Sequence, residues 1–129
     1  MSYLDLLNLL NFRLVGMFSK FSKSRYDTFS RILRMTGDIQ RELDDIRKGI
    51  DDVDNGIVKL LAQRRELALR LAKVKKALDV PIYDRAREQA LVERVKKWGA
   101  AHKLNEEFVE VVFRLIVMNS KEVQYHESA

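Results

Sequence analysis

The fold is decided by residues 38–78, which read DIQRELDDIRKGIDDVDNGIVKLLAQRRELALRLAKVKKAL. Apolar side chains recur there at spacings of three and four, the signature of an amphipathic helix. They are Ile39, Leu43, Ile46, Ile50, Val53, Ile57, Leu60, Leu61, Leu67, Leu71 and Val74. No proline interrupts the segment, and its two glycines are single weak points that a helix tolerates. The sequence therefore predicts one helix of about 40 residues, about 60 Å long.

Two shorter helices are predicted after the long one. Pro81 cannot continue a helix, so the long helix must end just before it. Asp84 then suits the N-cap of a second helix that ends near Ala101. After a polar break at 103–105, Asn105 suits the N-cap of a third helix. The apolar stripe of that third helix comprises Val109, Val112, Phe113, Ile116 and Val117.

The lengths of these helices predict a dimer. Two helices of about 18 residues are each about 27 Å long, so they cannot cover the apolar stripe of a 60 Å helix. The uncovered half must then be buried against another chain. We therefore expect an all-α, three-helix chain with one very long N-terminal helix, assembled as a homodimeric helical bundle.

Composition excludes several classes of protein. A chain of 129 residues corresponds to one domain, and 47% hydrophobic residues suffice for a core. The chain has no cysteine, which excludes disulfides and thiolate metal sites and makes a reducing cytoplasm the expected compartment. No run of about 18 uncharged apolar residues occurs, so no membrane span is expected.

Charge is distributed unevenly along the chain. Residues 1–36 hold six basic and two acidic side chains, whereas the net charge of residues 37–129 is only +1. The body of the protein is therefore close to neutral, and nucleic-acid binding is not expected.

Residues 1–36 differ in character from the rest of the chain. Apolar residues that can share one helical face precede a basic, serine-rich stretch at 19–30; they are Tyr3, Leu6, Leu7, Leu10, Leu14 and Phe18. Three interpretations remain open. The segment is a helix that packs on the dimer or frays, it is a helix lying on a membrane surface, or translation starts at Met35. We favour the first and regard membrane binding as a minor alternative.

Polar residues interrupt the apolar faces of the first and third helices. Arg64 falls on the stripe of the long helix, and Lys75, eleven residues later, returns to within about 20° of the same direction. Ser120 and Gln124 lie four residues apart on the apolar face of the third helix. Each alone has a structural explanation, such as a snorkelling Arg64, but together they indicate a polar site between helices.

A third group of polar residues begins the second helix, where Asp84, Arg87 and Glu88 share one face. Asp84 by itself is explained as a cap. Buried arginine and lysine need anionic partners, and Glu88 alone leaves an excess of positive charge. The sequence thus indicates a ligand with two carboxylates. Only His102 and His126 occur, neither beside residues that suggest a triad or a metal site, so no metal or cofactor is expected.

Five segments resemble the all-helical class of chorismate mutases. They are DIRKGIDDVD at 45–54, LLAQRREL at 60–67, KVK at 73–75, PIYDRARE at 81–88 and FRLI at 113–116, which leads to Ser120 and Gln124. The resemblance covers residues 38–125. It implies an extension at 1–36 and a chorismate mutase domain at 37–129, dimerised through interlocked long helices. It also implies conversion of chorismate to prephenate, the branch step towards phenylalanine and tyrosine.

The resemblance also implies a role for each polar residue. Arg64 and Arg47 would grip the two carboxylates of chorismate, with Ser120 assisting. Lys75 and Gln124 would donate hydrogen bonds to the ether oxygen whose bond breaks.

Further roles follow from the same resemblance. Glu88 and the backbone at Asp84 would fix the ring hydroxyl, and Arg87 would orient Glu88. Leu71 and Val117 would form apolar walls. Such a unimolecular rearrangement needs no nucleophile, metal or cofactor.

Helix geometry predicts which subunit supplies Arg47. Arg47 and Arg64 are 17 residues apart, which is about 26 Å along one helix. A ligand under about 10 Å across cannot be held by both arginines of one chain. We therefore expect Arg47 to act in trans, from the second chain of an antiparallel pair.

Two other functions remain as alternatives. An isochorismate pyruvate-lyase would use a similar dianion site and a similar lysine. A non-enzymatic helical dimerisation module would have a uniformly apolar seam, which Arg64, Lys75 and Gln124 interrupt.

Overall fold

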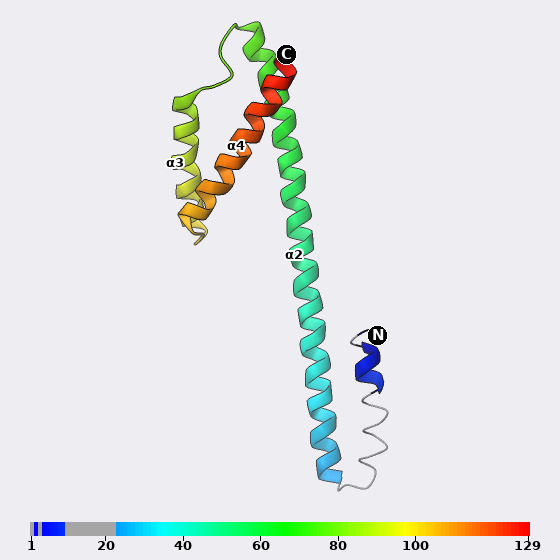
Figure 1. Ribbon diagram of the computed structural model, residues 1–129. Coiled ribbons are helices and arrows are strands. Elements are labelled where there is room, and N and C mark those ends of the chain that lie inside the picture. The colour runs from blue at the N-terminus through cyan, green and yellow to red at the C-terminus, as the bar shows by residue number, and fades with distance from the viewer. Residues whose placement is uncertain (1, 3, 10–22) are drawn as a thin grey trace. The chain divides into compact units, whose positions relative to one another are not determined.

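The computed structural model describes residues 2, 4–9 and 23–129. It is helical: α2 spans Lys23–Ala77, α3 spans Arg85–Ala101 and α4 spans Glu106–Ser128 (Figure 1). Residues 4–9 are also helical, and the described residues contain no β-strand. The predicted all-α class is confirmed, with this short N-terminal stretch in addition to the three expected helices. Most of the helical face expected between Tyr3 and Phe18 lies outside the described residues.

The predicted start of the long helix near Asp38 is wrong, because α2 begins at Lys23. The polar residues before Asp38 do not stop the helix, and two of their hydroxyls bond to carbonyls inside it. Thr28 Oγ1 donates to the carbonyl of Ser24 at 3.0 Å, and Thr36 Oγ1 donates to the carbonyl of Ile32 at 2.9 Å. The boundary expected at 36/37 therefore lies inside α2, and the division into an extension and a mutase domain stays a prediction.

The helix ends follow the sequence closely. The Asp84 carboxylate accepts from the N–H of Arg87 at 2.9 Å and caps α3, and Asn105 does the same for α4. Both predicted N-caps are confirmed. α2 and α3 each end in a turn with a left-handed residue, Asp79 (φ 53°) and Lys103 (φ 59°). In both turns a backbone N–H bonds to a carbonyl five residues earlier, which is the Schellman arrangement.

The chain divides into two units, Met1–Asp52 and Val53–Ala129. The described part of the first unit is dominated by the N-terminal portion of α2, whose polar face carries local pairs such as Arg41 with Asp38. The second unit contains the C-terminal portion of α2 together with α3 and α4 (Figure 1). Its buried core is small; the apolar members are Ala68, Ala72, Val92, Val95, Val109 and Val117.

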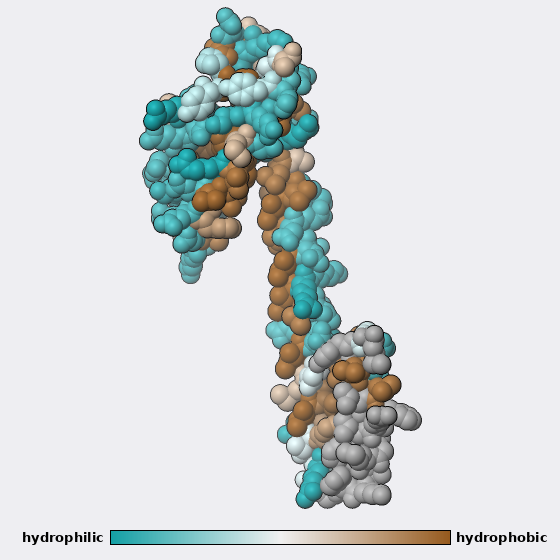
Figure 2. Space-filling view, in the orientation of Figure 1, coloured by the Kyte–Doolittle hydropathy of each residue, from teal (hydrophilic) through white to brown (hydrophobic). Residues whose placement is uncertain are grey.

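The apolar face predicted for the long helix is present and is largely exposed in the single chain. Figure 2 shows apolar residues exposed on the surface of α2 in each of the two units. Eight of the eleven members of the predicted face are more than half exposed; they are Ile39, Ile46 and Ile50 in the first unit and Val53, Ile57, Leu60, Leu67 and Val74 in the second. Within the part of the chain that the structure describes, no helix has the length and apolarity needed to cross a membrane.

α3 and α4 pack closely where Gly99 meets Val109. A Cβ added at Gly99 would lie 2.8 Å from Val109 Cγ2 and 3.3 Å from Val109 Cβ. Real Cβ atoms do not tolerate so short a contact, and the β-branched valine has little rotamer freedom with which to move away. A glycine at this position thus sets the spacing of the two helices.

The first prediction concerns this contact. Gly99→Ala should lower the free energy of unfolding by about 1–3 kcal/mol, because overpacking outweighs the better helix propensity of alanine. The matched control is Gly37→Ala in α2, where nothing lies within 4 Å of the added Cβ; it should be neutral or stabilising by up to about 1 kcal/mol. Thermal and urea unfolding measure both variants. Equal stability of Gly99→Ala and wild type would contradict the packing argument.

Candidate active site

The second unit contains a cavity of about 340 Å³ between α2, the loop after it, α3 and α4. This volume falls within the range of about 300–1,000 Å³ usual for small-molecule sites. Seven of the eight predicted site residues line it: Arg64, Lys75, Asp84, Arg87, Glu88, Ser120 and Gln124. The predicted wall residues Leu71 and Val117 line it as well. Residues far apart in sequence are thus brought together, while their chemical roles stay predictions.

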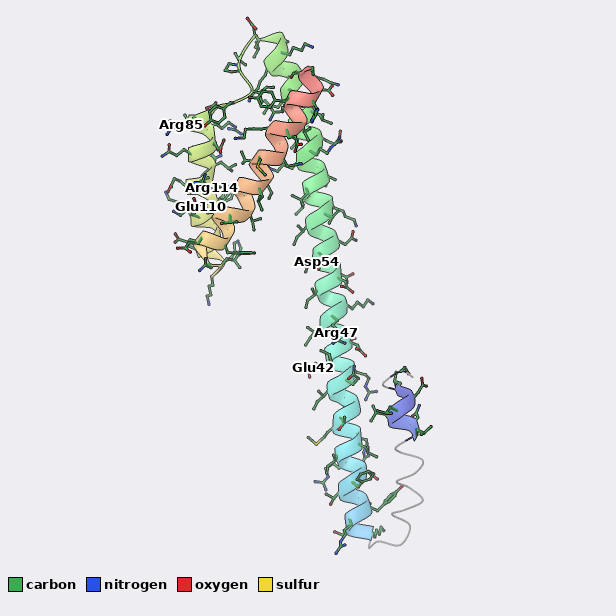
Figure 3. The ribbon with its side chains drawn as sticks, in the orientation of Figure 1. Glu42, Arg47, Asp54, Arg85, Glu110 and Arg114 are labelled. Atoms are coloured by element: carbon green, nitrogen blue, oxygen red, sulfur yellow. The ribbon has the colours of Figure 1, made fainter. Side chains whose placement is uncertain are left out.

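Arg47 is the exception. It lies on α2 in the first unit (Figure 3), and its side chain is 66% exposed. Its Nη1 lies 4.0 Å from Oδ1 of Asp44, one turn earlier on the same helix. It is not among the residues that line the cavity of its own chain.

Arg64 joins α2 to α4. Its Nη1 donates a hydrogen bond to Ser120 Oγ, and that hydroxyl in turn donates to the Ile116 carbonyl at 3.0 Å. Burial lowers the pKa of Arg64, and the nearby positive charge of Arg87 lowers it further. Among the described residues no carboxylate forms an ion pair with Arg64. The guanidinium therefore lies in a partly dehydrated position that an anion would stabilise.

Lys75 joins α2 to the loop that precedes α3. Its Nζ donates to the Ile82 carbonyl oxygen at 2.6 Å, and both residues line the cavity. An ammonium has three N–H donors, and this bond uses one of them. The other two are available to a ligand.

The start of α3 supplies both acidic residues of the cavity. The Asp84 carboxylate is engaged as the cap of α3. Oε2 of Glu88 lies 3.1 Å from Lys121 Nζ on α4. Among the described residues Glu88 Oε1 has no hydrogen-bond partner, so one oxygen of this carboxylate remains able to accept.

Gln124 is the most buried polar residue of the site, at 5% exposure. Its Nε2 donates to the Ser120 carbonyl at 3.2 Å, and its Oε1 is buried without a partner in the described structure. The role predicted for Gln124 requires Nε2 to donate to a ligand. Nε2 carries two N–H groups and the Ser120 carbonyl uses one of them, so the other is left to donate to a ligand.

Two cationic residues of the cavity were missed by sequence reasoning, Arg94 on α3 and Lys121 on α4. Both had a detectable signal. Arg94 lies seven residues after Arg87, two turns along the same face, and Lys121 lies three residues before Gln124. With them, five basic side chains surround the cavity against two carboxylates, so the arrangement favours an anionic ligand.

Comparison with known proteins identifies the family. The family model for chorismate mutase type II matches residues 46–125, and the chain therefore belongs to that family. It is 36% identical over 70 residues to the chorismate mutase of Methanocaldococcus jannaschii, a match that covers 54% of this chain and 71% of the relative.

Bifunctional relatives are similar over a shorter stretch. The chain is 39% identical over 64 residues to the bifunctional chorismate mutase/prephenate dehydratase of Escherichia coli strain K12. It is 38% identical over 64 residues to the protein of that name from Buchnera aphidicola subspecies Schizaphis graminum. Each match covers 50% of this chain but only 17% of the relative. The resemblance inferred from the sequence is thus confirmed at the level of the family.

The second prediction follows from the unpartnered oxygen of Gln124. A buried acceptor without a partner destabilises a fold by about 1–3 kcal/mol, and methionine fills a similar volume without one. Gln124→Met should therefore unfold at the same temperature as wild type or up to roughly 4 °C higher. Gln89→Met on the exposed surface of α3 is the control and should change nothing. A clear fall in the melting temperature of Gln124→Met alone would show that the amide stabilises the fold.

Proposed function

We propose that this chain is an isomerase that rearranges chorismate to prephenate, on the path towards phenylalanine and tyrosine. The observation that carries the proposal is the cavity of the second unit, in a member of the chorismate mutase type II family. Its excess of basic side chains, with Arg64 lacking a carboxylate partner in the described structure, suits a ligand with two carboxylates.

The reaction makes particular demands on such a site. One carbon–oxygen bond of the ether breaks while one carbon–carbon bond forms, and no atom enters or leaves the molecule. The protein must hold a flexible dianion in its compact conformer and stabilise the negative charge that grows on the ether oxygen. An acceleration of about 10⁶ requires about 8 kcal/mol of differential stabilisation. Charged and hydrogen-bonding side chains can supply it without covalent chemistry.

The carboxylates would be held by arginines. The Arg64–Ser120 contact places a guanidinium and a hydroxyl side by side, a pair that can bind one carboxylate together. In the proposed dimer, Arg47 of a second copy binds the other carboxylate. Arg87, whose positive charge already acts on Arg64, adds to the electrostatic frame.

The reacting ether oxygen would lie between α2 and α4. Lys75 is held at the cavity wall by the Ile82 carbonyl and keeps two donors for the ligand. Gln124 on α4 supplies a neutral donor, the second N–H of its Nε2. The free oxygen of Glu88 and the backbone at Asp84 then fix the ring hydroxyl.

The proposal includes a homodimer. Each unit exposes apolar residues of α2, and exposed apolar stripes of this kind are typical of interfaces, which supports a partner chain. A second copy of the same chain offers the complementary face by symmetry. The 17 residues between Arg47 and Arg64 support a place for Arg47 in the site of the partner.

The third prediction tests the activity and the part played by Lys75. The purified protein should convert chorismate to prephenate, measured by the loss of chorismate absorbance. Lys75→Ala should lower kcat by about 10²–10³ and change KM much less, because its contact strengthens in the transition state. Lys76→Ala, at the exposed neighbouring position, should leave both constants unchanged.

Two outcomes of this assay would overturn the proposal. Formation of salicylate and pyruvate from isochorismate, without prephenate from chorismate, would identify a lyase. Absence of turnover with either substrate would leave a non-enzymatic dimer. An unchanged kcat in Lys75→Ala would remove this lysine from the mechanism.

The fourth prediction tests whether Arg47 acts in trans. Arg47→Ala and Lys75→Ala homodimers should each be nearly inactive. After refolding an equal mixture, about half of the dimers contain one chain of each kind, and symmetry places both defects in one site. Activity should recover to roughly a quarter of the wild-type level. No recovery, with heterodimers demonstrated by differently tagged chains, would show that Arg47 does not act across the interface.

A further inference from the structure

Lys121 on α4 contacts two elements that border the cavity. Its Nζ lies 3.1 Å from Glu88 Oε2 on α3 and 4.9 Å from the centre of the Tyr83 ring in the preceding loop. The Lys121 and Glu88 side chains are only 29% and 24% exposed. The ammonium therefore interacts with both a carboxylate and an aromatic ring in a partly buried position.

This environment favours one position for the ammonium. Ion pairs that are largely shielded from water are screened less than surface pairs. A cation near an aromatic ring at this distance gains further attraction. Glu88 belongs to α3 and Lys121 to α4. The ion pair therefore fixes the Glu88 carboxylate against the neighbouring helix.

The Lys121–Glu88 pair also forms part of the wall between two cavities. Lys121 lines the candidate site, Tyr83 lines a second cavity of about 330 Å³, and Glu88 lines both. A carboxylate placed there has two possible orientations. The contact with Lys121 engages Oε2 and leaves Oε1 as the acceptor without a partner in the described structure.

The charge of Lys121 matters as much as its position. A bare carboxylate in the site would repel a ligand that carries two negative charges. Lys121 compensates the charge of Glu88 and does so without occupying its second oxygen. Glu88 can then accept a hydrogen bond from a ligand hydroxyl without a large electrostatic penalty.

We propose that Lys121, rather than the Arg87 expected from the resemblance, positions Glu88: it orients the carboxylate towards the ligand hydroxyl and offsets its negative charge against the ligand dianion. The proposal rests on the function proposed above. Lys121 acts through Glu88, and Tyr83 supports it from the loop.

The fifth prediction tests this role with chorismate as the substrate. Lys121→Met keeps the length of the side chain and removes its charge, and it should lower kcat/KM by about 10- to 100-fold, mainly through KM. Lys121→Arg should restore most of the loss, because it keeps a cation that can bond to Glu88. Tyr83→Leu, which leaves both charges in place, should cost about two- to fivefold.

A double-mutant cycle distinguishes positioning from direct contact. In a Glu88→Gln background there is no carboxylate to orient or compensate, so adding Lys121→Met should change kcat/KM by less than about twofold. The same loss in both backgrounds would show that Lys121 binds the ligand itself and would overturn the proposal. Full activity of Lys121→Met would overturn it as well.

A matched control is provided by a second ion pair between the same helices. Lys96 on α3 lies 3.8 Å from Glu110 on α4, with side-chain exposures of 31% and 26%, and neither residue lines the candidate site. Lys96→Met should leave kcat and KM unchanged; a loss equal to that of Lys121→Met would assign both pairs a purely structural role.

If Lys121→Met fails to fold, the Lys121→Arg and Tyr83→Leu variants carry the test, and full loss of activity in Lys121→Arg would count against the proposal.

The assay of the wild-type protein distinguishes failure of the proposed function from failure of the proposed role of Lys121. An inactive wild type rejects the proposed function and this proposal with it. An active wild type whose Lys121→Met variant keeps its kcat/KM rejects only the role of Lys121.

Discussion

The excess of positive charge around one small cavity is the constraint on which the site depends. Arg64, Lys75 and Arg87 come from two helices, and the cavity contains only two carboxylates, both already engaged by the protein. Two of these cations are held by a group other than a carboxylate. Arg64 bonds a serine hydroxyl, and Lys75 bonds a backbone carbonyl. Among the described residues Arg64 and Lys75 have no acidic partner, and in the proposed function the substrate dianion takes that place.

Much of this arrangement could be predicted because local chemistry dictates it. Asp84 and Asn105 can accept backbone N–H bonds, so each marks a helix start wherever the rest of the chain lies. Periodicity placed Arg64 and Lys75 on one face of the long helix. Resemblance to a family added the roles, and the family itself is confirmed by the match over residues 46–125.

Other features of the fold and the site depend on contacts that the spacing of residues in the sequence does not predict. The start of α2 at Lys23 was missed because the prediction rested on the apolar repeat that begins at Ile39, whereas the helix extends through the preceding polar residues, where Thr28 and Thr36 bond inside it. Lys121 was missed because a lysine on a helix is ordinarily a solvent-facing residue, and only the packing of α3 and α4 places Glu88 beside it. The orientation of the Gln124 amide likewise depends on the local helix geometry around Ser120.

The turn that ends α2 holds Lys75 in place, and it contains a residue in the left-handed backbone conformation. The Lys75 carbonyl accepts from the N–H of Val80 at 3.0 Å, while its ammonium donates to Ile82 at 2.6 Å, so one short loop fixes this residue at both ends. Asp79 adopts a left-handed conformation to allow it. The loop contacts no reacting atom in the proposed mechanism. It nevertheless fixes the position of the Lys75 side chain, which is proposed to stabilise the breaking bond. In the proposed mechanism, substitutions in that loop would change kcat by moving the Lys75 ammonium. They would leave the charged residues that bind the substrate unchanged.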